Sequence, residues 1–374
     1  MRKKTVGIQA LKSLAAAFAL LSGGANLQAQ SFGDTTQFAE QLMKEVKPLD
    51  KPLHVKVCLF DPLGKVGPVY NLAKDLSIAA QRWNLFTDIQ VFTNEGVAAN
   101  SFTIGQCEAV GITTLRARTF NPFMGSADAV GGVQNYKQMR TLMQALMGSE
   151  KLYPRSIHNQ YQVVGMGPLG AAYVMVNDKA ISSIEKAAGK RVAVMDWDKS
   201  QARMVQQLGA QPVASDITNF HTKFNNRAVD IIAAPAIAFG PLELYKGMGE
   251  KGGIFRLPLV NLTGSVIMNR TRIEKEVPDL DERMMKLRKF GVQFVDLAIQ
   301  MIEKVEGQVP AKYWMDLTPE EQKKYFGMMR EARIQLTKEG VYHPAMMTVL
   351  KRVRCSHEPG AGECSMTEES TVAQ

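Results

Sequence analysis

The chain has 374 residues, of which 45% are hydrophobic and 22% are charged, a composition that excludes wholesale disorder. Its 45 lysines and arginines exceed its 36 acidic residues, but four of the basic residues lie within positions 1–29, which leaves a mild 41 against 36 beyond them. Because no dense basic run is interleaved with aromatic residues, nucleic-acid binding is not favoured.

Residues 1–29 have the order of a secretory signal peptide. Three basic residues at 2–4 precede an apolar stretch at 14–21, and small residues follow near Ala29. This order predicts a cleavable signal peptide and a periplasmic location. No later apolar stretch has the roughly 18 residues that a membrane span needs, so we expect a soluble mature protein. Its roughly 345 residues suit two lobes better than one core.

Strands and helices alternate through the first part of the chain. The sequence predicts a strand at 54–60, a helix at 69–82, and strands at 88–92 and 108–113 with a short helix between them. Such alternation is typical of a parallel sheet with helices on its faces.

A second alternating unit follows a glycine-rich crossing. Residues 161–164 and 171–176 are expected as two strand pieces joined by Gly165–Gly170, and Ser182 with Glu185 predicts a capped short helix. Further strands are expected at 191–195, 211–213 and 229–233, with helices at 200–208 and 218–226. This pattern predicts a second compact α/β unit inserted into the first.

The last third of the chain is mainly helical after a return strand expected at 259–268. A long helix has an apolar stripe formed by Met284, Leu287, Gly291, Phe294, Ala298 and Met301. This stripe predicts a helix that packs across a lobe or between lobes. Thr318, Pro319 and Glu321 predict the start of another helix by cap, first-turn proline and capping-box acid.

Together these elements predict an α/β protein with a two-lobed, periplasmic-binding-protein-like fold. We expect mostly parallel sheets, flanking helices and a long C-terminal helix. The expected division is lobe 1 at 30–163 plus about 255–270, lobe 2 at 164–254, a helical segment at 271–354 that packs across the lobes, and a flexible polar tail at 355–374.

Enzymatic motifs are weak or absent. Gly165–Gly170 formally matches the dinucleotide fingerprint G-x-G-x-x-G, but a functional fingerprint opens a helix, whereas 171–176 is expected to be a strand. The hydrolase signatures G-x-S-x-G and H-E-x-x-H are absent, and the five histidines are scattered. We therefore expect no catalytic residue, no metal site and no cofactor.

The four cysteines suit disulfide formation in an oxidising compartment. Cys355 and Cys364 bracket a short loop that a disulfide would close. Cys58 ends one expected strand and Cys107 begins another, so these two are candidates for a bridge between neighbouring strands. The alternative is that Cys58 and Cys107 are two buried free thiols.

The candidate ligand-binding residues follow strands, because ligands of open α/β sheets bind beyond the carboxyl ends of the strands. After the strand at 108–113, Arg116 and Arg118 suit an anionic group, Asn121 adds a polar contact, and Phe120 and Phe123 would supply apolar walls. The alternative is that both arginines are surface or structural residues.

The strand at 191–195 offers the equivalent position in the second lobe. Trp197 presents a large ring with one hydrogen-bond donor. Asp196 and Asp198 suit a cationic or donor-rich group, or they favour the helix N-terminus through its dipole. Asp61 and Lys65 follow the first strand and are weaker candidates. We hypothesise that Arg118 and Trp197 face each other across the cleft.

Residues 177–235 resemble the second lobe of the solute receptors of TRAP transporters, the tripartite ATP-independent periplasmic carriers. The resemblance is carried by Ile181, Gly189-Lys190, Val192, Val194, Leu208-Gly209-Ala210, Pro212, Thr218 to Phe224, Val229-Asp230 and Pro235. It implies a solute-binding cleft and a permease partner. The family's two carboxylate-binding arginines fall on Ala193 and Tyr173, and its asparagine falls near Ala234.

These departures imply that the ligand is held in another way. Tyr173, Arg116, Arg118 and Trp197 are the expected replacement contacts, together with Pro235, which ends the matching segment. We therefore expect a monomeric periplasmic solute-binding protein that captures a small polar or anionic molecule for a membrane permease. The alternatives are a periplasmic, hydrolase-like enzyme using the same cleft, or an envelope interaction protein without a transport role.

Overall fold

The computed structural model describes residues 44–371, so the expected signal peptide lies outside the described part. The strands are β1 (Leu53–Phe60), β2 (Leu85–Phe92), β3 (Ala109–Thr113), β4 (Ile157–His158), β5 (Tyr161–Val176), β6 (Arg191–Met195), β7 (Gln211–Ser215), β8 (Ile231–Pro235), β9 (Gly253–Asn269) and β10 (Trp314–Met315). The order of strands and helices expected from the sequence is confirmed.

The helices flank these strands. They are α3 (Pro68–Ala80), α4 (Glu95–Thr103), α5 (Thr114–Ala117), α6 (Pro122–Gly125), α7 (Tyr136–Gly148), α8 (Lys199–Gln207), α9 (Phe220–Asn225), α10 (Leu244–Met248), α11 (Arg270–Ile273), α12 (Leu280–Gly291), α13 (Gln293–Glu306), α14 (Pro319–Lys338), α15 (Pro344–His357) and α16 (Glu368–Thr371). Short 3-10 turns include η1 (Gly64–Val66), η3 (Ser126–Asp128), η5 (Glu185–Ala187), η6 (Ala236–Ala238) and η8 (Gly362–Ser365).

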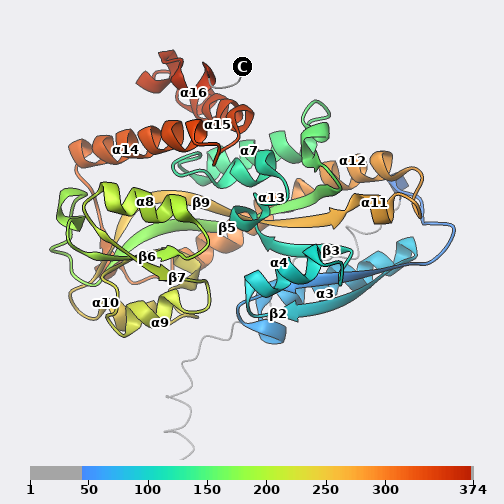
Figure 1. Cartoon of the computed structure of the whole chain (residues 1–374), viewed down its shortest axis with the longest axis horizontal. Coiled ribbons are helices and arrows are strands. Elements are labelled where there is room, and N and C mark those ends of the chain that lie inside the picture. The colour runs from blue at the N-terminus through green and yellow to red at the C-terminus, as the bar shows by residue number, and fades with distance from the viewer. Residues whose placement is uncertain (1–43, 372–374) are drawn as a thin grey trace, which may run out of the picture.

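All ten strands belong to one hydrogen-bonded sheet, ordered β2-β1-β3-β9-β5-β8-β6-β7, with β10 beside β9 and β4 beside β5. The expectation of two separate sheets is wrong in this respect. The 16-residue β5 and the 17-residue β9 run through both halves, pair antiparallel with each other and join the parallel strands at either end. The two halves are thus two ends of one sheet, each with its own helices (Figure 1).

The glycine-rich crossing at 165–170 is therefore strand. It belongs to the middle of β5, where the pairing with β9 shifts register between Pro168 and Gly170, with further shifts before and after them. Gly170 has a φ of +104°, a conformation that glycine adopts without strain. No helix opens at Gly170, which agrees with rejecting a dinucleotide site.

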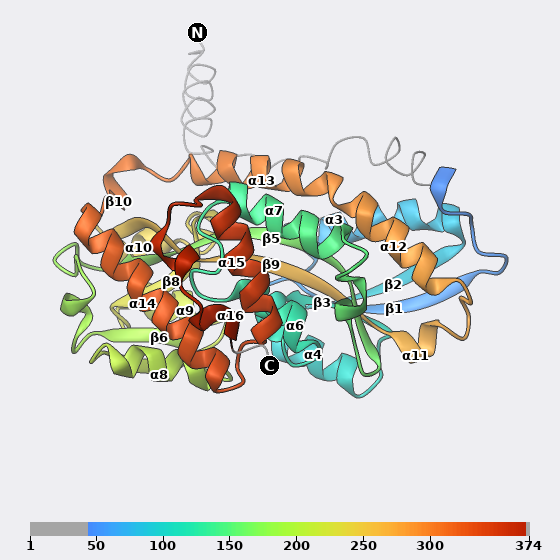
Figure 2. The same ribbon diagram turned by 90° about the horizontal axis from the view of Figure 1, so that it is seen from above.

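Helices cover both faces of the second half, with α8 on one face and α9 and α10 on the other (Figure 1). Helices α7, α15 and α16 lie over the middle of the molecule, α14 extends from there over the second half, and α12 and α13 follow one another along one long side (Figure 2). The expected long helix is divided at Val292, between α12 and α13. Within residues 44–371, no helix combines the length and the apolar character of a membrane span.

The apolar stripe predicted for the long helix is only half-buried. Leu287 and Phe294 pack with Trp83 around Val46, near the start of the described chain. The fully buried face of α13 consists of Val295, Ile299 and Ile302 instead. The predicted stripe therefore lies on a different side of the helix from the face that packs against the sheet. Residues on both sides are apolar, so periodicity alone did not distinguish the two faces.

The two predicted capping boxes had different outcomes. Thr318 and Glu321 form a reciprocal capping box at the start of α14. Ser182 and Glu185 do not, since only the 3-10 turn η5 forms and its N-cap residue, Ile184, offers no side-chain acceptor.

Both predicted disulfides are present, Cys58–Cys107 and Cys355–Cys364. No free cysteine occurs among the described residues. The alternative of two buried free thiols is thus wrong. Cys58 on β1 and Cys107 just before β3 are 49 residues apart, so their bond ties neighbouring strands of the first half together.

Removing the Cys58–Cys107 bond by Cys58→Ala with Cys107→Ala is expected to lower the free energy of unfolding by about 4 kcal/mol, because closing a 49-residue loop restricts the unfolded chain. Urea titration under oxidising conditions measures this. The matched control is Cys355→Ala with Cys364→Ala, whose shorter loop predicts a loss of about 3 kcal/mol. Wild-type stability in the first double variant would show that the bond does not constrain the chain as described.

The C-terminal segment, expected as a loose tail, is held to the fold at Glu363 and Glu369. Arg333 of α14 and Arg354 of α15 bind Glu363 of η8 and Glu369 of α16, and the side chains of both arginines and of Glu369 are 2% exposed. Composition alone suggested looseness, because the residues around these two acids are small and polar. We call these four residues the C-terminal clasp.

Candidate functional site

A bridge of four side chains joins the loop after β3 to the loop after β6. The guanidinium carbon of Arg116 lies 4.3 Å from the centre of the Trp197 ring. Arg118 donates from Nη2 to Oδ2 of Asp198 at 3.0 Å. These loops lie at the carboxyl ends of strands from opposite ends of the sheet, which is where the sequence placed the ligand contacts.

The partners in this bridge differ from those hypothesised. Arg118, expected to face Trp197, pairs with Asp198, while Arg116 stacks on Trp197. Cation–π stacking of this kind contributes about 1 kcal/mol when partly desolvated. The bridge therefore brings together four residues that the sequence singled out, Arg116, Arg118, Trp197 and Asp198.

Local structure fixes each arginine before it reaches the bridge. Glu95, the first residue of α4, accepts from Arg116 Nε at 2.9 Å and from the Thr113 backbone N–H at 2.8 Å. The side chain of Glu95 is 2% exposed, so its carboxylate binds Arg116 and the end of β3 and is almost closed off from solvent. On the other side, Asp198 caps α8 by accepting from the Ser200 N–H at 3.1 Å.

One polar atom of the bridge lacks a partner. Trp197 Nε1 is buried and has no hydrogen-bond partner among the described residues. A buried N–H without an acceptor costs roughly 1–3 kcal/mol. Both arginines are paired with carboxylates, and the indole N–H is a buried donor that an incoming acceptor could satisfy.

A second group of side chains surrounds the bulge in β5 and contains Tyr173 and Pro235. Tyr136 Oη donates to Glu306 Oε1 at 2.5 Å and accepts from the Ala171 N–H at 2.9 Å. A Cβ built on Gly170 would lie 3.8 Å from both Tyr136 Oη and Pro235 Cβ. We call Tyr136, Tyr173, Pro235 and Glu306 the central cluster.

Charge and burial in the central cluster oppose each other. Burial raises the pKa of the Glu306 carboxyl, and hydrogen bonds from Tyr136 and Tyr173 offset this only in part. Burial also raises the pKa of the Tyr173 hydroxyl, and the charge of the nearby Glu306 raises it further. Both phenols therefore stay protonated and act as donors.

The positions of the TRAP family's binding residues lie in an apolar environment here. Tyr173 and Ala234 are register partners on β5 and β8, and Ala193 of β6 packs on the same hydrophobic cluster. Ala234 is fully buried. The ring of Tyr173 meets Trp314 edge-on at 5.1 Å.

Two predicted ligand residues have structural partners instead. The Asp61 carboxylate is buried and accepts from the N–H groups of Leu63, Val69 and Tyr70 at 2.9 to 3.0 Å, which caps α3. Asn121 Oδ1 accepts from the Met124 N–H at 2.9 Å, and Asn121 Nδ2 donates to a backbone oxygen at 3.0 Å. Their hydrogen bonds are satisfied within the protein.

The other residues predicted near the ligand, Phe120, Phe123 and Asp196, also lie outside the bridge. Phe120 and Phe123, expected as cleft walls, are buried in the main hydrophobic core. Asp196 is exposed beside the bridge and does not join it. Glu95 could have been predicted from the sequence, since it too follows the carboxyl end of a strand. Glu306 ends a helix, and its position carries no such signal.

Asp128 of η3 is a further buried carboxyl that the sequence did not single out. It binds both the N–H and the hydroxyl of Thr263, at 2.9 and 2.6 Å, in the middle of β9. Burial raises the pKa of Asp128 to about 7, and the Arg118 charge counteracts this only weakly. The stability of the protein is therefore expected to depend on pH.

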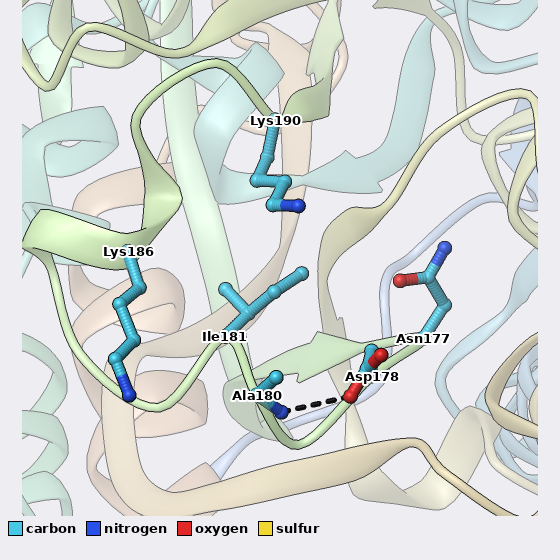
Figure 3. Close-up of a pocket in the computed structure, with 6 residues that line it drawn as sticks. All are labelled: Asn177, Asp178, Ala180, Ile181, Lys186 and Lys190. Carbon is cyan, nitrogen blue, oxygen red and sulfur yellow. Dashed lines mark hydrogen bonds between the residues drawn. The ribbon is translucent and has the colours of Figure 1, made fainter.

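A separate pocket of about 320 Å³ lies in the second half, lined by Asn177, Asp178, Ala180, Ile181, Lys186 and Lys190 (Figure 3). Lys190 precedes β6, so this pocket lies at the amino end of that strand, away from the loop that carries Trp197. Ligands of such sheets bind at the opposite edge, and we do not include it in the candidate site. Among the described residues, no group of histidine, cysteine and acidic side chains is arranged to hold a metal ion.

Comparison with known proteins identifies the family. The model of the family described as "Solute-binding protein AdeT 1/2" matches residues 76–369. The "Probable solute-binding protein AdeT1" of Acinetobacter baumannii is 40% identical over 313 residues, which cover 83% of this chain and all of that protein. The "Probable solute-binding protein AdeT2" of the same organism is 30% identical over 244 residues, which cover 65% of this chain and all of that protein.

Solved structures show the same fold at low sequence identity. A TRAP periplasmic solute-binding protein from Desulfovibrio desulfuricans, with bound sn-glycerol-3-phosphate, matches with a TM-score of 0.65 at 11% identity, covering 83% of this chain and 99% of that one. One from Haemophilus influenzae, with bound L-gulonate, matches with a TM-score of 0.64 at 11% identity, covering 80% and 98%. The chain belongs to the AdeT 1/2 family of solute-binding proteins and has the two-lobed fold of the TRAP periplasmic solute-binding proteins.

Proposed function

We propose that this protein is a periplasmic solute receptor that closes its two halves around a small polar molecule and presents the closed form to a membrane permease. The bridge formed by Arg116, Arg118, Trp197 and Asp198 carries this proposal. It joins the carboxyl-edge loops of opposite ends of the sheet, so its contacts exist only when the halves are together. Closure of this kind needs a difference in affinity between open and closed states and no bond chemistry.

The proposed solute contacts are the predicted residues that lie at or beside the two clusters: Arg116, Arg118, Tyr173, Asp196, Trp197 and Pro235. The unpartnered indole N–H of Trp197 supports this choice, because a solute acceptor would relieve its cost. Lobe 1 is proposed at 30–163 plus about 255–270 and lobe 2 at 164–254. The protein is proposed to act as a monomer without catalytic activity.

The ligands bound in the similar solved structures indicate which kinds of solute to consider. L-gulonate, sn-glycerol-3-phosphate and succinate are bound by TRAP receptors with 11 to 14% identity to this chain. In this chain, Arg116 and Arg118 already bind Glu95 and Asp198. We infer that these arginines act in closure and orient the solute rather than neutralise an acid alone.

Replacing Arg118 or Trp197 by alanine is expected to weaken solute-induced stabilisation and to shift the solute-free protein towards an open form. Each change removes one of the two contacts that form the bridge, and loss of a partly buried ion pair of this geometry costs about 1–3 kcal/mol. Small-angle X-ray scattering measures opening, and thermal shift with a retained solute measures binding. Arg82→Ala, an exposed arginine on the first half, is the matched control. Unchanged scattering and thermal shift in both variants would refute the proposed closure.

The alternatives give different results in one assay. A solute that remains bound through purification and is recovered chemically unaltered after incubation at 37 °C supports a receptor. Its conversion into a product would indicate an enzyme that uses the same cleft. Specific capture of an envelope protein without any bound small molecule would favour an interaction protein. Native mass spectrometry of the freshly purified protein distinguishes these outcomes.

A further inference from the structure

The carboxylate of Glu306 has an unusual environment for a partly buried acid. No lysine, arginine or histidine nitrogen lies within 4.0 Å of it in the described part of the chain, so it has no ion-pair partner there. It is the last residue of α13, where the helix dipole is negative. The nearby Glu303 charge adds further repulsion. Each of these features disfavours a carboxylate.

The groups around Glu306 suit a cation. Tyr136 and Tyr173 place two phenol rings beside it, and the ring of Trp314 adjoins Tyr173 at 5.1 Å. A carboxylate attracts an ammonium group by its charge, and the faces of neighbouring aromatic rings attract it by their quadrupole. Arg256, the cation whose charge acts on Tyr173, is held by Asp316 at 2.7 Å and lies over the Trp314 ring at 4.9 Å. It therefore does not neutralise Glu306.

Position makes the central cluster reachable. Pro235 ends β8 at its carboxyl edge, next to the bulge of β5 that joins the two halves. Glu306, Tyr136 and Pro235 each keep part of their surface exposed. A Cβ built on Gly170 would lie 3.4 Å from Ile302 Cγ2 and 3.8 Å from both Tyr136 Oη and Pro235 Cβ, so the cluster closes around this glycine at ordinary contact distance.

We propose that the solute carries an ammonium group, and that Glu306 binds this group with Tyr136 and Tyr173 around it. This inference rests on the proposed function, since it assigns the chemical class of the solute that the receptor captures. It assigns to Glu306 the role of counter-charge, and it explains why both arginines of the bridge are already paired with acids.

Glu306→Gln separates this role from a structural one. Glutamine has the same shape and can still accept from Tyr136, but it lacks the charge. If Glu306 were structural, the variant would melt at a lower temperature than the wild type. As an uncompensated carboxylate, it should instead melt at the same or a higher temperature without solute, while its affinity for an ammonium compound falls on the order of 30-fold or more.

The experiment uses isothermal titration calorimetry of the full mature chain with choline and putrescine as amine probes and succinate and L-gulonate as acid probes. Native mass spectrometry identifies any molecule retained from the cell. Glu303→Gln, an exposed acid one turn earlier on α13, is the matched control and is expected to bind like the wild type. Tyr173→Phe is expected to weaken amine binding less than Glu306→Gln.

Binding of an amine probe, or retention of an amine-containing molecule, that is lost in Glu306→Gln and kept in Glu303→Gln supports the proposal. Binding of acids lacking a basic nitrogen, with no amine bound, overturns it and leaves the receptor function standing. Amine binding that is equal in Glu306→Gln and the wild type also overturns it. If neither class binds and no molecule is retained, the receptor function falls as well.

Discussion

Arg354→Ala is expected to lower the free energy of unfolding by about 3–5 kcal/mol, because it leaves the buried Glu369 and the mostly buried Glu363 with Arg333 alone as a basic partner in the clasp. Arg354 Nε and Nη2 bind Glu363 at 2.7 and 2.9 Å, and Nη2 also binds Glu369 at 2.6 Å. Its remaining nitrogen, Nη1, donates to the Gly132 oxygen at 2.8 Å. Urea titration followed by circular dichroism measures the loss.

The effect of Arg354→Ala should reach the solute site. The C-terminal clasp holds the backbone oxygens of Val130 and Gly131 through Arg333, at 3.0 and 2.9 Å. This loop lies between Asp128 and Tyr136, so its loosening should also weaken solute binding. Arg352→Ala, on the exposed face of the same helix, is the control and should stay within about 0.5 kcal/mol of the wild type. Equal stability of both variants would show that the clasp does not hold the fold.

Between pH 4 and pH 7 the Asp128 carboxyl is expected to make the folded protein progressively less stable. Its folded-state pKa of about 7 lies above the usual value of 3.8, so the folded protein keeps a proton that the unfolded chain has lost. Stability therefore falls as pH rises through this window, by an amount on the order of 4 kcal/mol for this group alone. Asp128→Asn, which mimics the protonated form, should remove this dependence.

The measurement is the free energy of unfolding of both proteins from pH 4 to pH 8. The difference between Asp128→Asn and the wild type should increase in favour of the variant as pH rises. Asp75→Asn, at an exposed position on α3, should give a difference that does not change over the same range. A flat difference for Asp128→Asn would mean that the carboxyl is ionised in the fold throughout, stabilised by Thr263 and Arg118.

Local patterns predicted the architecture well for specific reasons. The strand at Arg191–Met195 and the helix start at Thr318 were found because apolar periodicity and capping residues act within a few positions of the chain. The Cys58–Cys107 bond was a candidate because each cysteine lies at the end of an expected strand of the same α/β unit, and β1 and β3 are neighbours in the sheet. Features of this kind depend on short segments of the sequence. They could therefore be predicted although the solved structures with this fold share little sequence identity with the chain.

The candidate site was predicted only in part, because charged side chains choose partners across the fold. Arg116 and Arg118 were identified as important, but their acids, Glu95 and Asp198, are 21 and 80 residues away from them. Asp61 was expected to contact the ligand. Its carboxylate caps α3, because it accepts hydrogen bonds from three backbone N–H groups that follow it in the chain. Nothing in the sequence marks such competition between a ligand and the backbone.

The sequence by itself determined the order of strands and helices and the resemblance to solute receptors, and it made the two cysteine pairs candidates for disulfides, because these follow from periodicity, spacing and local chemistry. The tertiary structure alone decided that one sheet passes through both halves, that the arginines of the bridge are already paired, and that Glu306 meets two tyrosines without a basic partner in the described chain. Charges in a low-dielectric interior interact strongly over a few ångströms, and only the fold sets which residues come that close.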